Sequence, residues 1–294
     1  MSNTEIAREI KPIARESLDK LFIDLQTNYH AIKPLSIKYN DISDYFTFEE
    51  RLHTIGIKNI NFYEFYRNKE KYYNHIKNIL EYYKRKGTQK TEICIYKYIF
   101  NLYYGSITNF SIPNVIQVLQ KYRPTHILDP TCGFGNRMVG CCALPFVESY
   151  IGIDCNTNLE QPLNELKTFI SNHSKTRIEV LIQDCLDVDY SKMKYNCCFT
   201  SLPYYDTEIY RNSKIYTSKD DMDHNFYKPL IERTYKHLEN GGIYVLNVPE
   251  LVYKRICVDI LGECDKKMKL FKRNRQNTYV EWLYVWRNGC NHRN

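Results

Sequence analysis

The sequence predicts an α/β fold in which a doubly wound, mostly parallel sheet follows a mainly helical N-terminal part. From about residue 90, short apolar segments alternate with segments of helical periodicity, the pattern of strands buried on both faces of a parallel sheet. Before that point, apolar and aromatic residues recur at three- and four-residue steps, as in amphipathic helices. We therefore expect a helical domain at 1–90, open to nucleic acid or a partner protein, and an α/β domain at 91–294.

The N-terminal part predicts two long helices with one irregular stretch between them. The helices are "ARESLDKLFIDLQTNY" and "NFYEFYRNKEKYYNHIKNILEYYKRKG", and the second ends in a basic turn before Gly87, a good stop signal. The stretch "AIKPLSIKYNDISDYF" shows no clear period, so we expect it to be irregular.

The α/β part begins with a helix in "SIPNVIQVLQKYRP", which places Ile112, Val115 and Leu119 on one face and stops before Pro124. The expected parallel strands are, in order, "HILDP", "SYIGIDC", "IEVLIQDC", "YNCCFTSLP" and "IYVLNVP". Further helices are expected in "NLEQPLNELKTFISNHS" and "NFYKPLIERTYKHLENGG". The final segment, "KLFKRNRQNTYVEWLYVWRN", predicts two strands joined by a polar turn, antiparallel at the sheet edge.

Composition sets the broad class of the protein. The formal charge of +7 and the pI of about 8.7 suit a polyanionic partner, but dedicated nucleic-acid domains reach a pI above about 9. Most of the eleven cysteines sit in apolar segments such as "GCCALPF", without the CxxC spacing of zinc sites. The polar N-terminus lacks the apolar core of an export signal, and no segment is long and apolar enough to span a membrane. We expect a reduced intracellular protein, in cytoplasm or nucleus, without structural metal.

A glycine turn follows the first expected strand, in "HILDPTCGFGNRMVG". The strand ends in Asp129, and Gly133 and Gly135 then permit positive φ and a close approach of the backbone to a ligand. A ligand here would lie at the carboxyl end of a parallel strand. The residues Pro130, Thr131 and Cys132 separate the strand from the glycines, which disfavours a dinucleotide fingerprint. An ordinary strand-to-helix turn is the simpler alternative.

Two further acids end the next two strands. Asp154 closes "YIGID" about 25 residues after Asp129, and an acid at this strand tip commonly accepts hydrogen bonds from ribose hydroxyls. Asp184 closes "LIQD", where it could accept from an exocyclic amino group such as that of adenine. Each acid could instead cap a turn or a helix.

These three acids and the glycine turn resemble the fold of S-adenosylmethionine-dependent methyltransferases. The segment "TSLPYYD" resembles the [Asn/Asp/Ser]-Pro-Pro-[Tyr/Phe/Trp] tetrapeptide of DNA amino-methyltransferases, which modify adenine-N6 or cytosine-N4, and "DPTCGFG" resembles their cofactor loop. The resemblance covers residues 104–287 and extends, through "FYKPLIE", to giant-virus and phage enzymes. It implies S-adenosyl-L-methionine as cofactor, bound by Asp129, Pro130, Thr131, Gly133, Gly135, Asp154, Cys155, Asp184 and Cys185.

The resemblance also assigns roles on the fourth strand. The side chain of Ser201 and the backbone carbonyl of Leu202 would hold the two hydrogens of a base amino group, Pro203 would fix the loop, and Tyr204 would stack on a flipped base. Leu202 stands where the family has its first proline. Other expected substrate contacts are Tyr205, Lys272, Arg273 and Arg275.

Several alternatives stay open. The base is adenine or cytosine, and Ser at position 201 tilts weakly to cytosine. DNA is the expected partner, with RNA possible and no membrane. The same tetrapeptide class serves methylation of RNA bases and of protein glutamine, and Leu202 leaves room for a catalytically weak homologue that only binds nucleic acid. Upstream, Ser111, Ile112 and Pro113 are candidates for a segment over the methionine end of the cofactor, or Ser111 is simply a helix cap.

Overall fold

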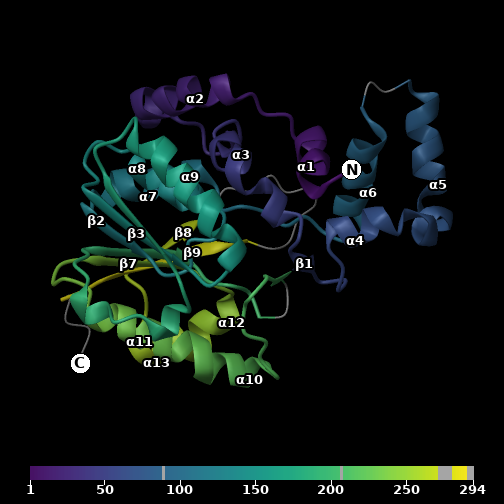
Figure 1. The fold of residues 1–294 in the computed structure, drawn as a ribbon. Coiled ribbons are helices and arrows are strands. Elements are labelled where there is room, and N and C mark those ends of the chain that lie inside the picture. The colour runs from purple at the N-terminus through teal and green to yellow at the C-terminus, as the bar shows by residue number, and fades with distance from the viewer. Residues whose placement is uncertain (88–89, 206–207, 271–279, 290–294) are drawn as a thin grey trace.

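A seven-stranded mixed sheet forms the centre of the molecule (Figure 1). The structure is a computed structural model that describes residues 1–87, 90–205, 208–270 and 280–289. Within this part, the strand order is β4-β3-β2-β5-β7-β9-β8, and all pairings are parallel except the two that involve β9. The strands are β2 (His126–Asp129), β3 (Ser149–Asp154), β4 (Arg177–Ile182), β5 (Cys197–Ser201), β7 (Ile243–Asn247), β8 (Lys266–Lys269) and β9 (Trp282–Arg287).

The predicted fold class is therefore confirmed, including the antiparallel edge. From β2 the chain builds outward through β3 and β4, and it then returns to the other side of β2 with β5 and β7. The strand order thus reverses between β2 and β5. In open α/β sheets ligands bind outside the carboxyl ends of the strands at such a switch point.

Helices cover both faces of the sheet (Figure 1). On one face lie α7 (Ile112–Tyr122), α8 (Asn136–Cys142) and α9 (Glu160–Ser171), and their buried side chains join those of the sheet in one core. The other face carries a second core. Its helices are α10 (Lys219–Met222), a π-helix (Asp223–Tyr227), α11 (Lys228–Lys236), α12 (Glu250–Val252), a second π-helix (Tyr253–Cys257) and α13 (Val258–Leu261).

The N-terminal part is mainly helical and contributes to two cores. Its α2 and α3 lie over the helices of the first face and bury Leu18, Phe22 and Ile42 in the sheet core, whereas α1, α4, α5 and α6 build a third core to the side (Figure 1). Whether the chain divides at residue 90 into two domains stays a prediction. The helices are α1 (Asn3–Ile10), α2 (Arg15–Asn28), α3 (Asn40–Arg51), α4 (Phe62–Arg67), α5 (Lys69–Arg85) and, beyond residue 90, α6 (Glu92–Tyr103).

The short elements connect these layers. Two-residue strands β1 (Ile55–Gly56) and β6 (Glu208–Ile209) pair with each other, antiparallel, and so join the N-terminal part to the chain after β5. The 3-10 turns are Tyr29–Ala31, Thr157–Leu159, Cys185–Asp187 and Tyr190–Lys192.

Three expectations about single elements were wrong. The long second N-terminal helix is two helices, α4 and α5, separated at Asn68, whose φ of −104° and ψ of 26° leave the helical region. The stretch expected to be irregular contains the first part of α3, whose inward face buries polar residues as well as Ile42, so that the apolar period is lost. The first strand of the edge pair begins at Lys266, earlier than expected, and the turn at 271–279 lies outside the described residues.

Candidate active site

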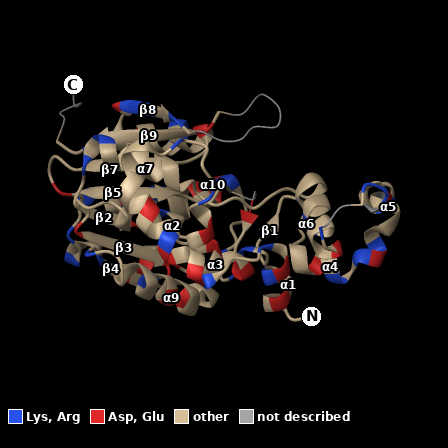
Figure 2. Cartoon of the chain, turned by 90° about the horizontal axis from the view of Figure 1, so that it is seen from above, with Lys and Arg blue, Asp and Glu red and all other residues tan. Residues whose placement is uncertain are grey.

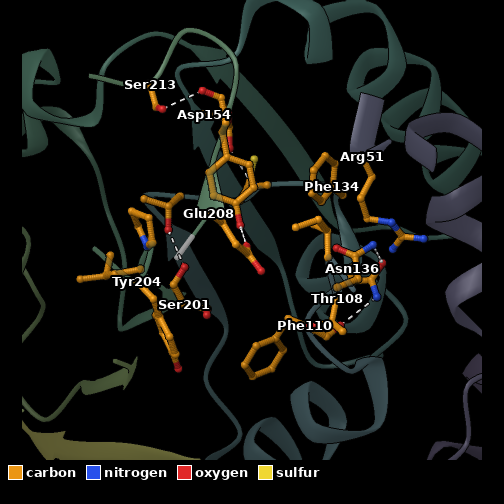
Figure 3. A pocket seen from close by; sticks show the side chains of 18 of the residues that line it. Arg51, Thr108, Phe110, Phe134, Asn136, Asp154, Ser201, Tyr204, Glu208 and Ser213 are labelled. Atoms are coloured by element: carbon orange, nitrogen blue, oxygen red, sulfur yellow. Dashed lines mark hydrogen bonds between the residues drawn. The ribbon is translucent and has the colours of Figure 1, made fainter. Parts of the chain in front are cut away.

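A cavity of about 1180 Å³ opens at the carboxyl ends of the strands, around the switch point. It joins the glycine turn after β2 to the loop after β5. Figure 3 shows Ser201 and Tyr204 on one side, and Phe134 and Asn136 on the other. The sequence-predicted residues that line the cavity are Pro130, Thr131, Gly133, Asp154, Cys155, Asp184, Cys185, Ser201, Leu202, Pro203, Tyr204 and Tyr205.

Five of the predicted residues are placed otherwise. Asp129 and Gly135 do not line the cavity. Lys272, Arg273 and Arg275 lie outside the described residues. Of the upstream candidates, Ser111 lines the cavity and takes the N-cap position of α7 without a capping hydrogen bond from its side chain, whereas Ile112 and Pro113 are buried in the helix.

The two glycines of the turn have different roles. Both adopt positive φ, +56° at Gly133 and +82° at Gly135. A Cβ on Gly133 would meet nothing within 4 Å, so this residue leaves open space on the cavity side. A Cβ on Gly135 would lie 2.5 Å from Cδ2 of Leu166. Gly133 thus permits the approach of a ligand, and Gly135 permits the packing of α9 on the turn.

Asp129 stabilises the start of the glycine turn from the interior of the protein. Its carboxylate is fully buried and accepts from Nε and Nη2 of Arg137 at 2.8 and 3.0 Å and from the hydroxyl of Tyr150 at 2.8 Å. Arg137 also donates to the backbone carbonyl of Thr131. A buried charge needs such pairing, and the pair in turn fixes the start of the cavity wall. Asp129 therefore acts on the cavity through the backbone of Thr131.

The acids at the next two strand tips face the cavity. Asp154 accepts from the N–H of Gly133 at 2.8 Å and from that of Asn156 at 3.0 Å, one on each carboxylate oxygen. Each oxygen keeps a further lone pair for a ligand hydroxyl. Burial raises the pKa of Asp154, against the effect of these two backbone hydrogen bonds. Asp184 caps a turn through the N–H of Leu186 at 2.9 Å and also lines the cavity.

The loop after β5 offers the backbone carbonyl of Leu202 to a ligand. The carbonyl of Ser201 accepts from Oγ1 of Thr131 at 3.1 Å, and that of Pro203 accepts from the hydroxyl of Tyr227 at 2.5 Å. In the described part of the chain no hydrogen bond reaches the carbonyl of Leu202 between them. The N–H of Leu202 donates to the carbonyl of Asn247 at 3.2 Å, a contact that proline could not make.

The two tyrosines behind the proline are held differently. Tyr204 lines the cavity beside Ser201 (Figure 3). Tyr205 has a φ of +38°, a strained value for a residue other than glycine. Its N–H donates to the hydroxyl of Tyr227 at 3.2 Å, and its own hydroxyl donates to buried Asp223 at 2.8 Å. The π-helix that carries Asp223 and Tyr227 therefore holds the loop in shape.

Several residues that line or support the cavity escaped sequence reasoning. The inward face of α3 reaches the glycine turn, where Ser43 donates to Asn136 and Thr47 donates to the carbonyl of Phe134 at 3.0 Å. Only three-dimensional proximity links these segments. Asn247, at the tip of β7, accepts from Ser201, and here a signal existed, because an otherwise apolar strand ends in an amide.

The segment that follows β6 forms hydrogen bonds with the N-terminal part. Beyond β6, the hydroxyl of Tyr210 donates to Glu208, and Arg211 donates from Nε to Glu50 at 2.8 Å. Glu50 is 6% exposed and also accepts from Asn156, the residue that donates its N–H to Asp154. One wall of the cavity therefore depends on contacts between the N-terminal part and the sheet.

The cysteines near the site are poor nucleophiles. Burial raises the pKa of Cys197 and Cys198, and that of Cys155 to about 12, so the reactive thiolate is disfavoured at neutral pH. All cysteines in the described part of the chain are free thiols. Across the same residues, no cluster of three or more acids, histidines or cysteines is arranged to hold a metal ion.

Two features of the whole chain were also compared with the sequence: helices long enough to cross a membrane, and the distribution of Lys and Arg. Among the described residues, no helix has the length and apolar character needed to cross a membrane. Figure 2 shows Lys and Arg both on α5 and on β8, which lie far apart. The charge excess therefore does not mark a single surface on the described part of the chain.

No family model and no curated protein matches this chain. Among solved structures, it is similar to an rRNA methylase from Streptococcus thermophilus at 15% identity and a TM-score of 0.41, over 62% of this chain and 99% of that one. A tRNA m1G37 methyltransferase from M. jannaschii shows 15% identity and a TM-score of 0.40, over 63% of this chain and 52% of that one. An RNA methyltransferase from Salinibacter ruber shows 11% identity and a TM-score of 0.40, over 61% and 93%. These similarities are too low to indicate a function.

Proposed function

We propose that the protein is a methyltransferase that uses S-adenosylmethionine to methylate the exocyclic amino group of a flipped base in DNA. The observation that carries the proposal is one cavity that holds both halves of such a site. Gly133 and Asp154 form one half, and Ser201, Leu202 and Tyr204 form the other. RNA bases and glutamine amides present a similar planar amino group, and they are the alternatives that the test must separate.

The residues fit the cofactor at the glycine turn. Asp154 keeps lone pairs for the ribose hydroxyls, Gly133 leaves open space beside it, and Asp184 keeps one carboxylate oxygen that caps no turn. When bound, S-adenosylmethionine supplies a methyl group on a positively charged sulfur.

The loop after β5 would orient the amino group. An amino nitrogen on a base is a weak nucleophile, because its lone pair is delocalised into the ring. The Leu202 carbonyl and Ser201 Oγ accept its two hydrogens, and Tyr204 stacks on the base, so that the lone pair faces the methyl carbon. The cofactor would supply the methyl group, the two acceptors would hold the amino nitrogen towards it, and one amino proton would leave to water. Positioning of this kind supplies most of the rate.

Transfer of labelled methyl groups to DNA, RNA and protein tests the proposal. Wild type is expected to label DNA, and Tyr204→Ala to reduce kcat/KM by about 5- to 150-fold, since base–aromatic stacking is worth about 1–3 kcal/mol. The affinity for S-adenosylmethionine should not change, because Tyr204 is proposed to contact the base that receives the methyl group.

Tyr103→Ala is the matched control, since this tyrosine is 50% exposed and does not line the cavity. Labelling of RNA or protein alone would replace DNA by that acceptor. Cofactor binding without labelling of any acceptor would contradict the proposed activity.

A further inference from the structure

The tip of β7 carries a buried amide that faces Ser201. Asn247 pairs with Ser201 in the parallel register of β5 and β7, and it is 3% exposed. Ser201 Oγ donates to Oδ1 of Asn247 at 2.9 Å, while Nδ2 of Asn247 donates to the backbone carbonyl of Trp282 at 3.0 Å. Because a carbonyl can only accept, the Trp282 contact fixes which end of the amide faces Ser201.

This arrangement decides what Ser201 offers to the cavity. A serine hydroxyl has one hydrogen and two lone pairs. With its hydrogen directed to Asn247, Ser201 presents lone pairs alone. The Leu202 carbonyl is also an acceptor, so these two neighbouring groups both offer acceptors to the cavity.

We propose that Asn247 is a positioning residue that determines specificity for an amino group over a carbonyl oxygen at the same place on a base. The inference rests on the proposed function and extends it to a residue that acts through Ser201. An amino group can donate one hydrogen to Ser201 Oγ and one to the Leu202 carbonyl. A carbonyl oxygen in its place has no hydrogen to donate, so neither acceptor would have a partner. Sites built to match a hydrogen-bonding group reject analogues that lack it, because their buried polar groups are left unpaired.

Without Asn247 the hydroxyl can rotate. Ser201 could then donate to a carbonyl as readily as it accepts from an amino group, and the discrimination would fall. Asn247→Leu removes the acceptor at nearly constant volume. Asn247→Asp is the matched control, because a carboxylate still accepts the hydrogen of Ser201 but cannot donate to Trp282.

The experiment measures equilibrium binding of single nucleotides. They are compared two at a time, and the bases in each comparison differ in carrying an amino group or a carbonyl oxygen at the same position. The probes are adenosine against inosine 5′-monophosphate and cytidine against uridine 5′-monophosphate, with S-adenosylhomocysteine present. Wild type is expected to prefer the amino base of one pair by about tenfold or more. Asn247→Leu should reduce the preference to about threefold or less, and Asn247→Asp should keep it. Melting curves and cofactor affinity check folding, and Asn247→Ala replaces the leucine variant if that one does not fold.

The outcomes distinguish a failure of the proposed function from a failure of the role assigned to Asn247. A wild type that binds amino and carbonyl bases equally contradicts the proposed function and this inference with it. A wild type that prefers the amino base, together with a folded Asn247→Leu or Asn247→Ala variant that keeps the preference, overturns the role of Asn247 alone. So does Asn247→Asp losing the preference as fully as Asn247→Leu.

Discussion

Lys97, on α6, is a partly exposed lysine with few nearby groups that could neutralise its charge. Its Nζ donates to Asn101 at 2.9 Å and lies 4.9 and 5.1 Å from the ring centres of Phe100 and Phe62. None of the ion pairs in the described part of the chain includes it. Burial, with a smaller effect of the positive charge of Arg51, lowers the pKa of Lys97 from 10.5 to about 7.

This pKa predicts a pH-dependent stability. Between about pH 7 and 10.5 the unfolded chain binds a proton at Lys97 that the folded chain does not, so the free energy of unfolding rises with pH, by at most about 1.4 kcal/mol per unit. Because Lys97 is partly exposed, we expect a rise of about 1–2 kcal/mol relative to Lys97→Met. Urea unfolding of both proteins across this range measures it. Parallel stability curves for the two proteins would contradict the prediction.

At the scale of elements, the glycine turn predicts two substitutions with different effects. Gly133→Ala should cost about 1–2 kcal/mol of stability for its positive φ, and it should weaken cofactor binding because the new methyl group faces open space beside Asp154. Gly135→Ala should cost about 1–3 kcal/mol more, because the buried Leu166 must move. Denaturant unfolding and cofactor titration give both quantities. Equal stabilities of the two variants would show that α9 yields to the added methyl group.

At the scale of the whole molecule, the N-terminal part and the sheet share a core. Phe22 of α2 is fully buried, and its ring lies 5.8 Å from that of Phe169 on α9. We therefore expect Phe22→Ala to cost about 3–5 kcal/mol and to reduce hydrogen-exchange protection in β2, β3 and β4. Phe65→Ala, in the third core, is the comparison, and its first effect is expected on α4 and α6. Unchanged protection of the sheet in Phe22→Ala would show that α2 unfolds by itself.

The succession of the strands along the chain and the place of the cavity at their carboxyl ends were predictable from local patterns. Each apolar strand with an acid or a small polar residue at its tip carries its own signal, and parallel strands bring these tips to one edge. The inward face of α3 was not predictable, because Ser43 and Thr47 are buried through hydrogen bonds to the glycine turn and leave no apolar period. The break at Asn68 was missed because the apolar period continues on both sides of it.

By itself, the sequence determined the α/β class, the antiparallel edge and the residues that gather at the carboxyl ends of the strands, since alternation of apolar segments and turn residues is written locally along the chain. Only the tertiary structure decided what those residues face. In the tertiary structure Asp129 accepts a hydrogen bond from Arg137 in the interior, and Ser201 donates its hydroxyl hydrogen to Asn247. The tertiary structure also placed α2 and α3 on the sheet core. These are contacts between distant segments, and hydrogen-bond partners at such separations follow from packing and register rather than from any local pattern.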